Sequence, residues 1–368
     1  MAEIRLESVR HSYLEQPVAE ADFALRRVDL AWRDGGAYAL LGPSGCGKTT
    51  LLNIVSGLIH PTEGRVLFDG ADVTGATPVA RNIAQVFQFP VVYDTMTVYD
   101  NLAFPLRNRR LPAAEVDARV REIARMLELE STLGQRASGL TADGKQKISL
   151  GRGLVRSDVN VIMFDEPLTV IDPHLKWVLR SKLKELHQRT GRTMIYVTHD
   201  QTEALTFAEE VVVMHEGQVV QTGTPVELFE RPRHTFVGYF IGSPGMNLLA
   251  CELDGDQVRV GGERIAYDGR LRDDVRPGPD ARVEIGVRPE FVRFAAAGED
   301  GLPVRVLRGI DAGRFRIVDV ETRAVASTKL KLLVPEGARV PADDARIVLD
   351  ASRTHLYIDG WLATEAGA

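Results

Sequence analysis

Short apolar runs separated by amphipathic stretches dominate the chain up to about Pro232. Residues 37–41, 161–164 and 193–198 are short and mostly apolar, which is typical of strands buried on both faces. Elsewhere, apolar residues recur at spacings of three and four, which predicts helices. One such face comprises Val116, Val120, Ile123 and Leu127. Strands that alternate with helices predict an α/β fold with a largely parallel sheet.

The pattern changes after Phe236. Gly and Pro separate short runs in which apolar and polar residues alternate, as in residues 257–260, 282–287, 315–318 and 354–358. Short alternating runs with turn signals predict a small all-β barrel or sandwich. We therefore expect an α/β domain over residues 1–235, with a helical insertion at about 89–157, followed by an all-β domain over residues 236–368.

The turn after the first apolar run carries the clearest chemistry. Gly42 to Thr49 fits the pattern G-x-x-x-x-G-K-[ST], between a predicted strand and a predicted helix. Glycines let backbone N–H groups surround phosphate oxygens, and the helix N-terminus favours negative charge. The pattern predicts that this loop binds ATP, that Lys48 reaches the β- and γ-phosphates, and that Thr49 ligates Mg²⁺. The phosphate-binding residues are Gly42, Ser44, Gly45, Cys46, Gly47, Lys48, Thr49 and Thr50.

Two further apolar runs end in polar residues at the same predicted sheet edge. Asp165 and Glu166 end the second run, where Asp165 would hold the Mg²⁺ water shell and Glu166 would polarise a water for attack on the γ-phosphate. A solvated acidic turn is the alternative interpretation. His199 follows the third run, although a lone histidine is more often structural than catalytic.

In this order, these elements resemble the ATPase subunits of ATP-binding-cassette (ABC) transporters, in particular bacterial importers of maltose, other sugars and glycerol phosphate. The resemblance covers nearly the whole chain. It implies that Gln88 binds Mg²⁺ or the attacking water, that His199 contacts the γ-phosphate, and that Asp172 ends a loop crossing a dimer interface. Tyr13 matches an aromatic residue that stacks on adenine; a half-buried strand aromatic is the alternative. The C-terminal region resembles an oligonucleotide-binding-like (OB-like) domain that regulates or dimerises such subunits.

One segment departs from the family pattern. Family members carry Leu-Ser-Gly-Gly-Gln where this chain has Leu140 followed by Thr141, Ala142, Asp143 and Gly144. In the family this signature reaches across a dimer to the γ-phosphate on the partner. A Cβ obstructs that approach, and a carboxylate at ~4 Å from a phosphate charge costs about 4 kcal/mol at an effective dielectric near 20. The cost falls if Asp143 turns away or pairs with Lys145 or Lys147.

The altered signature is compatible with more than one arrangement of ATPase subunits. We favour a heterodimer with a second ATPase subunit whose signature is normal, because Lys48, Glu166 and His199 are all retained. A homodimer with two impaired sites, or a regulatory subunit that hydrolyses ATP poorly, are the alternatives. Some glycerol importers resemble the two-ATPase arrangement.

The composition of the chain limits its expected partners and cellular location. The net charge of −6 gives no electrostatic footprint for nucleic acid, which disfavours a soluble cassette ATPase acting on nucleic acid or ribosomes. The two cysteines form no disulfide framework, so a reducing cytosol fits. No signal core and no apolar stretch of ~20 residues is apparent. We therefore expect a peripheral protein on the cytoplasmic face of the bacterial inner membrane, with two transmembrane permease subunits and a solute-binding protein as partners.

Overall fold

The chain forms two compact units, Met1–Pro225 and Val226–Ala368. The computed structural model describes residues 2–254, 257–269, 271–272, 275, 277–324 and 328–364. No helix among these residues is both long enough and apolar enough to cross a membrane.

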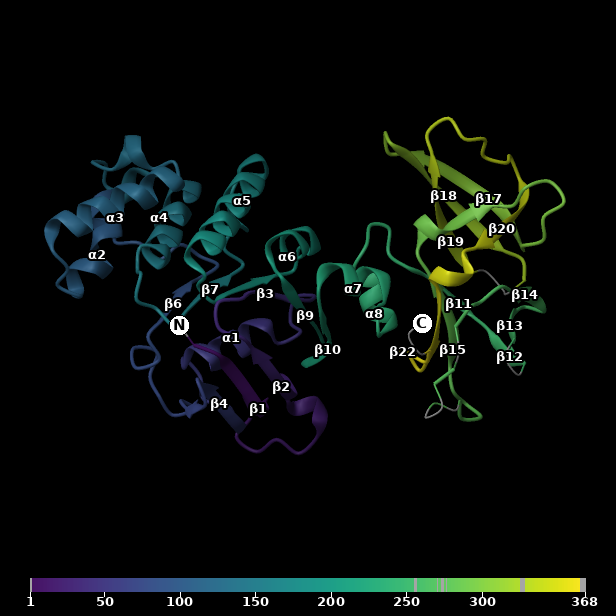
Figure 1. The fold of residues 1–368 in the computed structure, drawn as a ribbon, viewed down its shortest axis with the longest axis horizontal. Coiled ribbons are helices and arrows are strands. Elements are labelled where there is room, and N and C mark those ends of the chain that lie inside the picture. The colour runs from purple at the N-terminus through teal and green to yellow at the C-terminus, as the bar shows by residue number, and fades with distance from the viewer. Residues whose placement is uncertain are drawn as a thin grey trace. The chain divides into compact units, whose positions relative to one another are not determined.

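A six-stranded sheet forms the centre of the first unit, in the order β10-β9-β3-β8-β7-β6 (Figure 1). All its pairs are parallel except β9 with β10, and every residue of β3, β7 and β8 is buried. This confirms the α/β prediction. The strands are β6 (Ile83–Val86), β7 (Val161–Asp165), β8 (Met194–Thr198), β3 (Ala37–Leu41), β9 (Glu210–His215) and β10 (Gln218–Gly223); the helices among them are α1 (Lys48–Ser56), α5 (Pro173–Thr190) and α6 (Gln201–Phe207).

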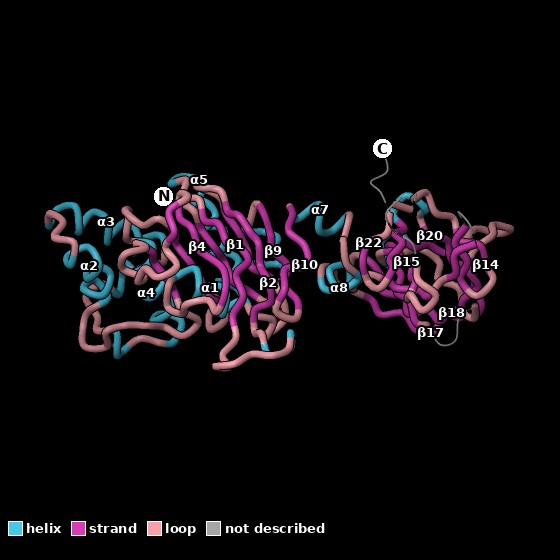
Figure 2. The backbone as a smooth tube through the Cα atoms, turned by 90° about the horizontal axis from the view of Figure 1, so that it is seen from below, coloured by secondary structure: helices cyan, strands magenta, loops and turns pink. Residues whose placement is uncertain are grey.

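A second sheet in this unit is antiparallel, which the predicted alternation of strands and helices did not anticipate (Figure 2). Its first strand buries Ile4, Leu6 and Val9 in the core of the unit and leaves alternate residues more exposed. That period of two is the mark of a strand with one solvated face. The strands are β2 (Leu25–Trp32), β1 (Ile4–His11), β4 (Glu63–Phe68) and β5 (Ala71–Asp72).

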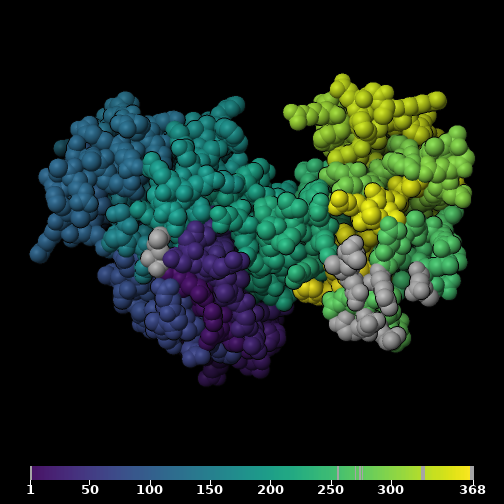
Figure 3. Space-filling model, viewed as in Figure 1, coloured from purple at the N-terminus to yellow at the C-terminus, as the bar shows by residue number. Residues whose placement is uncertain are grey.

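Three α-helices follow β6 and precede β7 in the chain. They form a lobe of the first unit, drawn in blue in Figure 3. They are α2 (Val98–Asn108), α3 (Ala113–Met126) and α4 (Ala142–Leu154). Thr97 caps α2 by accepting a hydrogen bond from the backbone of Asp100, and Val116, Val120 and Ile123 form the buried face of α3. The apolar spacing in the sequence is therefore the packing face of a real helix.

The second unit begins earlier in the chain than the sequence indicated. Its limit lies between Pro225 and Val226 rather than at residues 235/236, so α7 (Pro225–Glu230) and α8 (Thr235–Phe240) belong mainly to it. One reason is Arg288, which is buried and donates hydrogen bonds to the carbonyl oxygens of Phe229 (2.6 Å) and Ile241; another is Tyr357, whose hydroxyl donates to the carbonyl oxygen of Pro232 at 2.9 Å. A single guanidinium therefore ties the ends of both helices to the β domain.

Antiparallel sheets make up the rest of the second unit, as predicted for an all-β domain. Their apolar residues form one continuous core that includes Leu249, Val318 and Leu356. The strands are β11 (Asn247–Ala250), β12 (Glu252–Asp254), β13 (Gln257–Val260), β14 (Glu263–Ile265), β15 (Val283–Val287), β16 (Val292–Phe294), β17 (Leu302–Asp311), β18 (Phe315–Thr322), β19 (Lys329–Pro335), β20 (Asp344–Leu349), β21 (Thr354–Ile358) and β22 (Trp361–Leu362).

We predict that Arg288→Met destabilises the protein by about 3 kcal/mol, because it leaves buried carbonyl groups without donors. Burial lowers the pKa of Arg288 to about 10, so the side chain is still a cation at neutral pH. Urea unfolding of the full chain measures the decrease in the free energy of unfolding. Arg293→Met is the matched control: Arg293 pairs with Glu299 at the surface, and its loss should have little effect. Equal losses in the two variants would contradict the capping role.

Candidate nucleotide site

The phosphate loop lies between β3 and α1, and close backbone contacts require two of its glycines, Gly42 and Gly47. Gly47 caps α1 with φ at +98°. A Cβ on Gly47 would lie 2.8 Å from the carbonyl oxygen of Ala24, and one on Gly42 would lie 2.3 Å from that of Met214. Both distances are shorter than van der Waals contact, so neither position accepts a larger residue. The loop is thus held in place by contacts within the fold.

Lys48 is buried on the inner side of this loop. Its Nζ donates hydrogen bonds to the carbonyl oxygens of Gly42 (2.8 Å) and Pro43 (2.9 Å), and it lies 3.9 Å from Sγ of Cys46. Burial raises the pKa of the Cys46 thiol, and the nearby Lys48 charge only partly opposes this. Cys46 is therefore a protonated, packed thiol, while Lys48 supplies the positive charge of the loop.

Asp165, at the end of β7, lies opposite the first turn of α1. Oγ1 of Thr49 donates a hydrogen bond to its carboxylate at 3.3 Å. Burial raises the pKa of Asp165 and the negative charge of Glu166 raises it further, whereas Thr49 and Lys48 oppose the shift. A desolvated carboxylate next to a hydroxyl is an oxygen donor set that suits Mg²⁺, so these residues fit the predicted metal.

Glu166 is held between two other predicted catalytic residues. Its carboxylate accepts a hydrogen bond from Nε2 of Gln88 at 3.3 Å and lies 3.1 Å from Nδ1 of His199. Its backbone has φ at +45°, an unusual value for a residue with a side chain. Thr169 supports this conformation, because its hydroxyl donates to the Glu166 carbonyl oxygen at 3.0 Å. The structure thus places Gln88, Glu166 and His199, far apart in sequence, in one constellation.

Gln146 is a positioning residue that the sequence analysis missed. It is fully buried in α4, and its Nε2 donates to the carbonyl oxygens of Phe87 (3.2 Å) and Pro167 (2.9 Å). Phe87 directly precedes Gln88 in the chain, and Pro167 directly follows Glu166. The side-chain amide of Gln146 therefore fixes the backbone next to both catalytic residues. The sequence does contain a signal for this role: Gln146 is four residues before Leu150, and this spacing places a polar residue on the buried face of the helix.

Two other predicted residues lie at the edges of the site. Tyr13 follows β1 and is 65% exposed, and its hydroxyl forms a 3.0 Å hydrogen bond with Oγ1 of Thr50. That exposure rules out the half-buried strand interpretation and leaves the ring available to a base. Asp172 caps α5 by accepting a hydrogen bond from the backbone of His174 at 2.9 Å. Its contact with a second ATPase domain stays a prediction.

The altered signature opens α4. Thr141 is the N-cap, and its side chain accepts a hydrogen bond from the backbone N–H of Gly144 at 3.3 Å. Ala142 and Asp143 form the first turn. The segment thus forms a regular capped helix start, and its departure from the family pattern stays a prediction. Gly144 is tightly placed, because a Cβ there would lie 3.2 Å from Cβ of Leu140.

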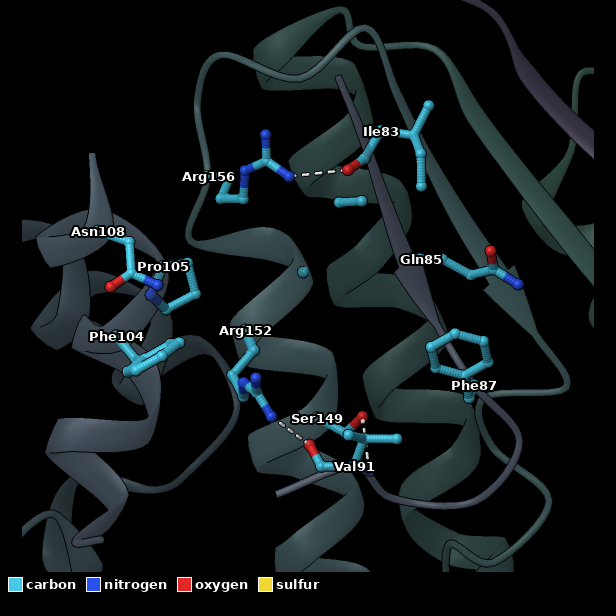
Figure 4. A pocket seen from close by; sticks show the side chains of 12 residues that line it. Ile83, Gln85, Phe87, Val91, Phe104, Pro105, Asn108, Ser149, Arg152 and Arg156 are labelled. Carbon is cyan, nitrogen blue, oxygen red and sulfur yellow. Dashed lines mark hydrogen bonds between the residues drawn. The ribbon is translucent and has the colours of Figure 1, made fainter. Parts of the chain in front are cut away.

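A hollow of about 300 Å³ separates the helical lobe from the sheet edge next to Gln88 (Figure 4). Phe104 and Pro105 line it from α2, and Phe87 and Val91 line it from the segment after β6. Arg152 of α4 fixes this segment by donating to the carbonyl oxygen of Val91 at 2.5 Å. Two of the lining residues, Phe87 and Val91, are exposed apolar side chains, which makes this part of the hollow a surface suited to a partner.

Comparison with known proteins agrees with this geometry. Residues 25–169 match the ABC transporter family, and residues 242–292 match the MalK OB fold domain. The chain is 39% identical to the sn-glycerol-3-phosphate import ATP-binding protein UgpC of Cereibacter sphaeroides, over 97% of this chain and 98% of that protein. It is 40% identical to the oligosaccharides import ATP-binding protein MsmX of Bacillus subtilis, over 79% of each.

A solved dimeric ATP-binding cassette in a post-hydrolysis state, bound to ADP and phosphate, has the same fold as the first unit. Its TM-score is 0.54 at 27% identity, covering 60% of this chain and 98% of that chain. The chain therefore belongs to the ABC transporter family and is an ATPase. Within the family it has the two-domain organisation of import ATP-binding proteins, a cassette followed by an OB fold domain.

We predict that Asp165→Asn stabilises the nucleotide-free chain while it abolishes ATP hydrolysis. The pKa of Asp165 is raised in the folded chain, so ionisation of its carboxylate lowers the free energy of unfolding. This loss is absent below the ordinary carboxyl pKa, grows as the pH rises towards the raised pKa, and is complete above it. At neutral pH the variant should gain only about 0.5 to 1 kcal/mol, since the hydrogen bond from Thr49 and the charge of Lys48 offset part of the desolvation cost. Thermal unfolding and phosphate release measure the two effects.

Asp117→Asn is the control for this prediction. The hydrogen bond from Arg121 lowers the pKa of Asp117, so its removal should change stability in the opposite direction. A less stable Asp165→Asn chain would show that the carboxylate is a structural partner instead of a desolvated ligand.

Proposed function

We propose that this chain is the ATP-hydrolysing motor of a bacterial importer for a sugar, a polyol such as glycerol, or a glycerol-phosphate-like solute. The observation that carries the proposal is the Glu166 carboxylate, held by Gln88 and His199 beside the phosphate loop. The import ATP-binding proteins that are similar over both domains support the transport role. The sugar and glycerol-phosphate part of the range follows from the glycerol-3-phosphate and oligosaccharides for which these relatives are named.

The chemistry follows from the positions of the chain's own groups. Glu166 accepts the proton of the attacking water, His199 donates a hydrogen bond to the charge that develops on the γ-phosphate, and Lys48 neutralises the β- and γ-phosphates. Thr49, Asp165 and Gln88 would hold Mg²⁺, which supplies charge neutralisation when bound. Tyr13 offers a flat face to adenine. Catalysis of this kind depends mostly on positioning and charge stabilisation.

The hollow beside Gln88 is the site at which we propose that a permease subunit docks. Phe87 and Val91 on its lining are apolar and exposed, and Phe87 directly precedes Gln88 in the chain. A segment seated there would move Gln88 and thereby couple transport to hydrolysis. The partners are two transmembrane permease subunits and a periplasmic or extracellular solute-binding protein. The motor would lie peripherally on the cytoplasmic face of the inner membrane.

We predict that Glu166→Gln lowers ATP turnover in the purified transporter by about 100-fold or more, because an amide cannot accept the proton of the attacking water. ATP binding should persist, since Lys48 and the loop are unchanged. Phosphate release and binding of a fluorescent ATP analogue measure the two. Glu321→Gln is the control, because Glu321 pairs with Arg305 in the second unit. Turnover that survives Glu166→Gln would assign the base to another residue.

We propose further that the motor works as a heterodimer with a second ATPase subunit whose signature is normal. The phosphate loop of this chain is intact, so its own site would face the normal signature and hydrolyse ATP. The partner's ATP would face Thr141 to Gly144 and turn over slowly. The retained set of Lys48, Glu166 and His199 supports this arrangement over a regulatory subunit or a homodimer with two impaired sites.

We predict two distinct cassette subunits when the native complex is purified in mild detergent and its subunits are counted by mass spectrometry. Only copies of this chain would mean that the altered signature serves both sites. Replacing Ala142 and Asp143 with glycine should raise turnover by about threefold to tenfold, or about 1 kcal/mol of barrier. Gly144 is left unchanged because of its contact with Leu140. Unchanged turnover would show that the signature is not limiting.

A further inference from the structure

The carboxylate of Asp143 is turned into the protein and not outward with its neighbours. Thr141 and Ala142 are exposed at the start of α4, but the side chain of Asp143 is only 29% exposed. Its Oδ1 is buried and accepts no hydrogen bond from any residue that the structure describes. A negative charge in this position needs a nearby cation to offset its desolvation.

Lys147 supplies that cation. Its Nζ lies 3.5 Å from Oδ2 of Asp143, one helical turn along α4, and its side chain is 8% exposed. Lys145, the other basic residue in reach along the chain, is engaged by Asp94 at 2.8 Å. Glu128 also lies within the electrostatic reach of Lys147, but it has its own partner in Lys182 at 2.9 Å. The Asp143–Lys147 pair is therefore a distinct, largely buried ion pair inside the signature helix.

We propose that Lys147 is a positioning residue that holds the Asp143 carboxylate away from the exposed end of α4, so that the altered signature can still close on a phosphate. The inference rests on the proposed function, in which this end of the helix faces ATP bound to a partner subunit. With the pair intact, the first turns of α4 carry no net charge from these two residues. The obstructions that remain are then the Cβ atoms of Ala142 and Asp143.

Loss of Lys147 would leave the negative charge of Asp143 without its cation. An unpaired carboxylate is driven out of the protein towards water, and the exposed end of α4 at Thr141 and Ala142 directly precedes Asp143 in the chain. There it would oppose the triphosphate of the partner. The defect should consequently disappear when the charge of Asp143 is removed as well, a response that a purely structural lysine would not give.

The test is a double-mutant cycle in the native complex that compares Lys147→Gln, Asp143→Asn and the double variant. We expect Lys147→Gln to raise the KM for ATP roughly tenfold (about 1.4 kcal/mol) and to weaken ATP-dependent association of the cassette subunits. Binding of a fluorescent ATP analogue to the phosphate loop of the isolated chain should not change. Asp143→Asn in the same chain should restore both KM and association.

Controls separate positioning from folding. Lys147→Arg keeps the charge and should match the wild type, and Lys145→Gln removes the neighbouring Lys145–Asp94 pair without freeing Asp143. Thermal unfolding of each variant reports folding. If Lys147→Gln does not fold, Asp143→Asn alone decides, since it should leave KM equal to or below the wild-type value; a raised KM would overturn the inference.

The outcomes also distinguish this inference from the function on which it rests. A wild-type complex that associates with ATP, combined with a double variant as defective as Lys147→Gln, would overturn the inference alone. Lys147→Gln that behaves as the wild type would do the same. A wild-type chain that hydrolyses ATP but never associates with a cassette subunit would overturn the proposed dimer and this inference together.

Discussion

The desolvated charge at the carboxyl edge of the central sheet is the constraint on which the rest of the structure depends. Asp165 ends β7 in a buried position where its own charge is unfavourable, which its raised pKa reports. Thr49 and Lys48 are placed against it by the end of β3 and the start of α1. The free protein thus contains an unfavourable negative charge that a cation would relieve, and the packing of three fully buried strands maintains it.

Helix α4 connects this edge to the two surfaces that we propose for a permease subunit and for a second cassette. Its buried Gln146 fixes the backbone next to Gln88 and next to Glu166. Its Arg152 fixes the segment that rims the hollow, and its first turn is the altered signature. A rigid helix that contacts all three regions gives a direct physical route by which docking, closure and hydrolysis can influence one another.

The signature shows how a sequence departure acquires its meaning from local packing. Asp143 in isolation predicts repulsion from a phosphate. In the folded chain the same residue is paired with Lys147 and largely withdrawn from the surface. The charge of the segment is therefore set by a pair of residues and not by the motif alone.

The sequence by itself determined the α/β class, the all-β second domain, and the phosphate loop, because period, glycine spacing and strand-end acids are local signals. It located Glu166 and His199 but not their contact, and it missed Gln146 and the antiparallel sheet of β1. Only the tertiary structure decided which lysine pairs with Asp143, that Tyr13 is exposed, and that Arg288 draws α7 and α8 into the second unit. These outcomes depend on contacts between residues distant in the chain or on burial, and a linear pattern encodes neither.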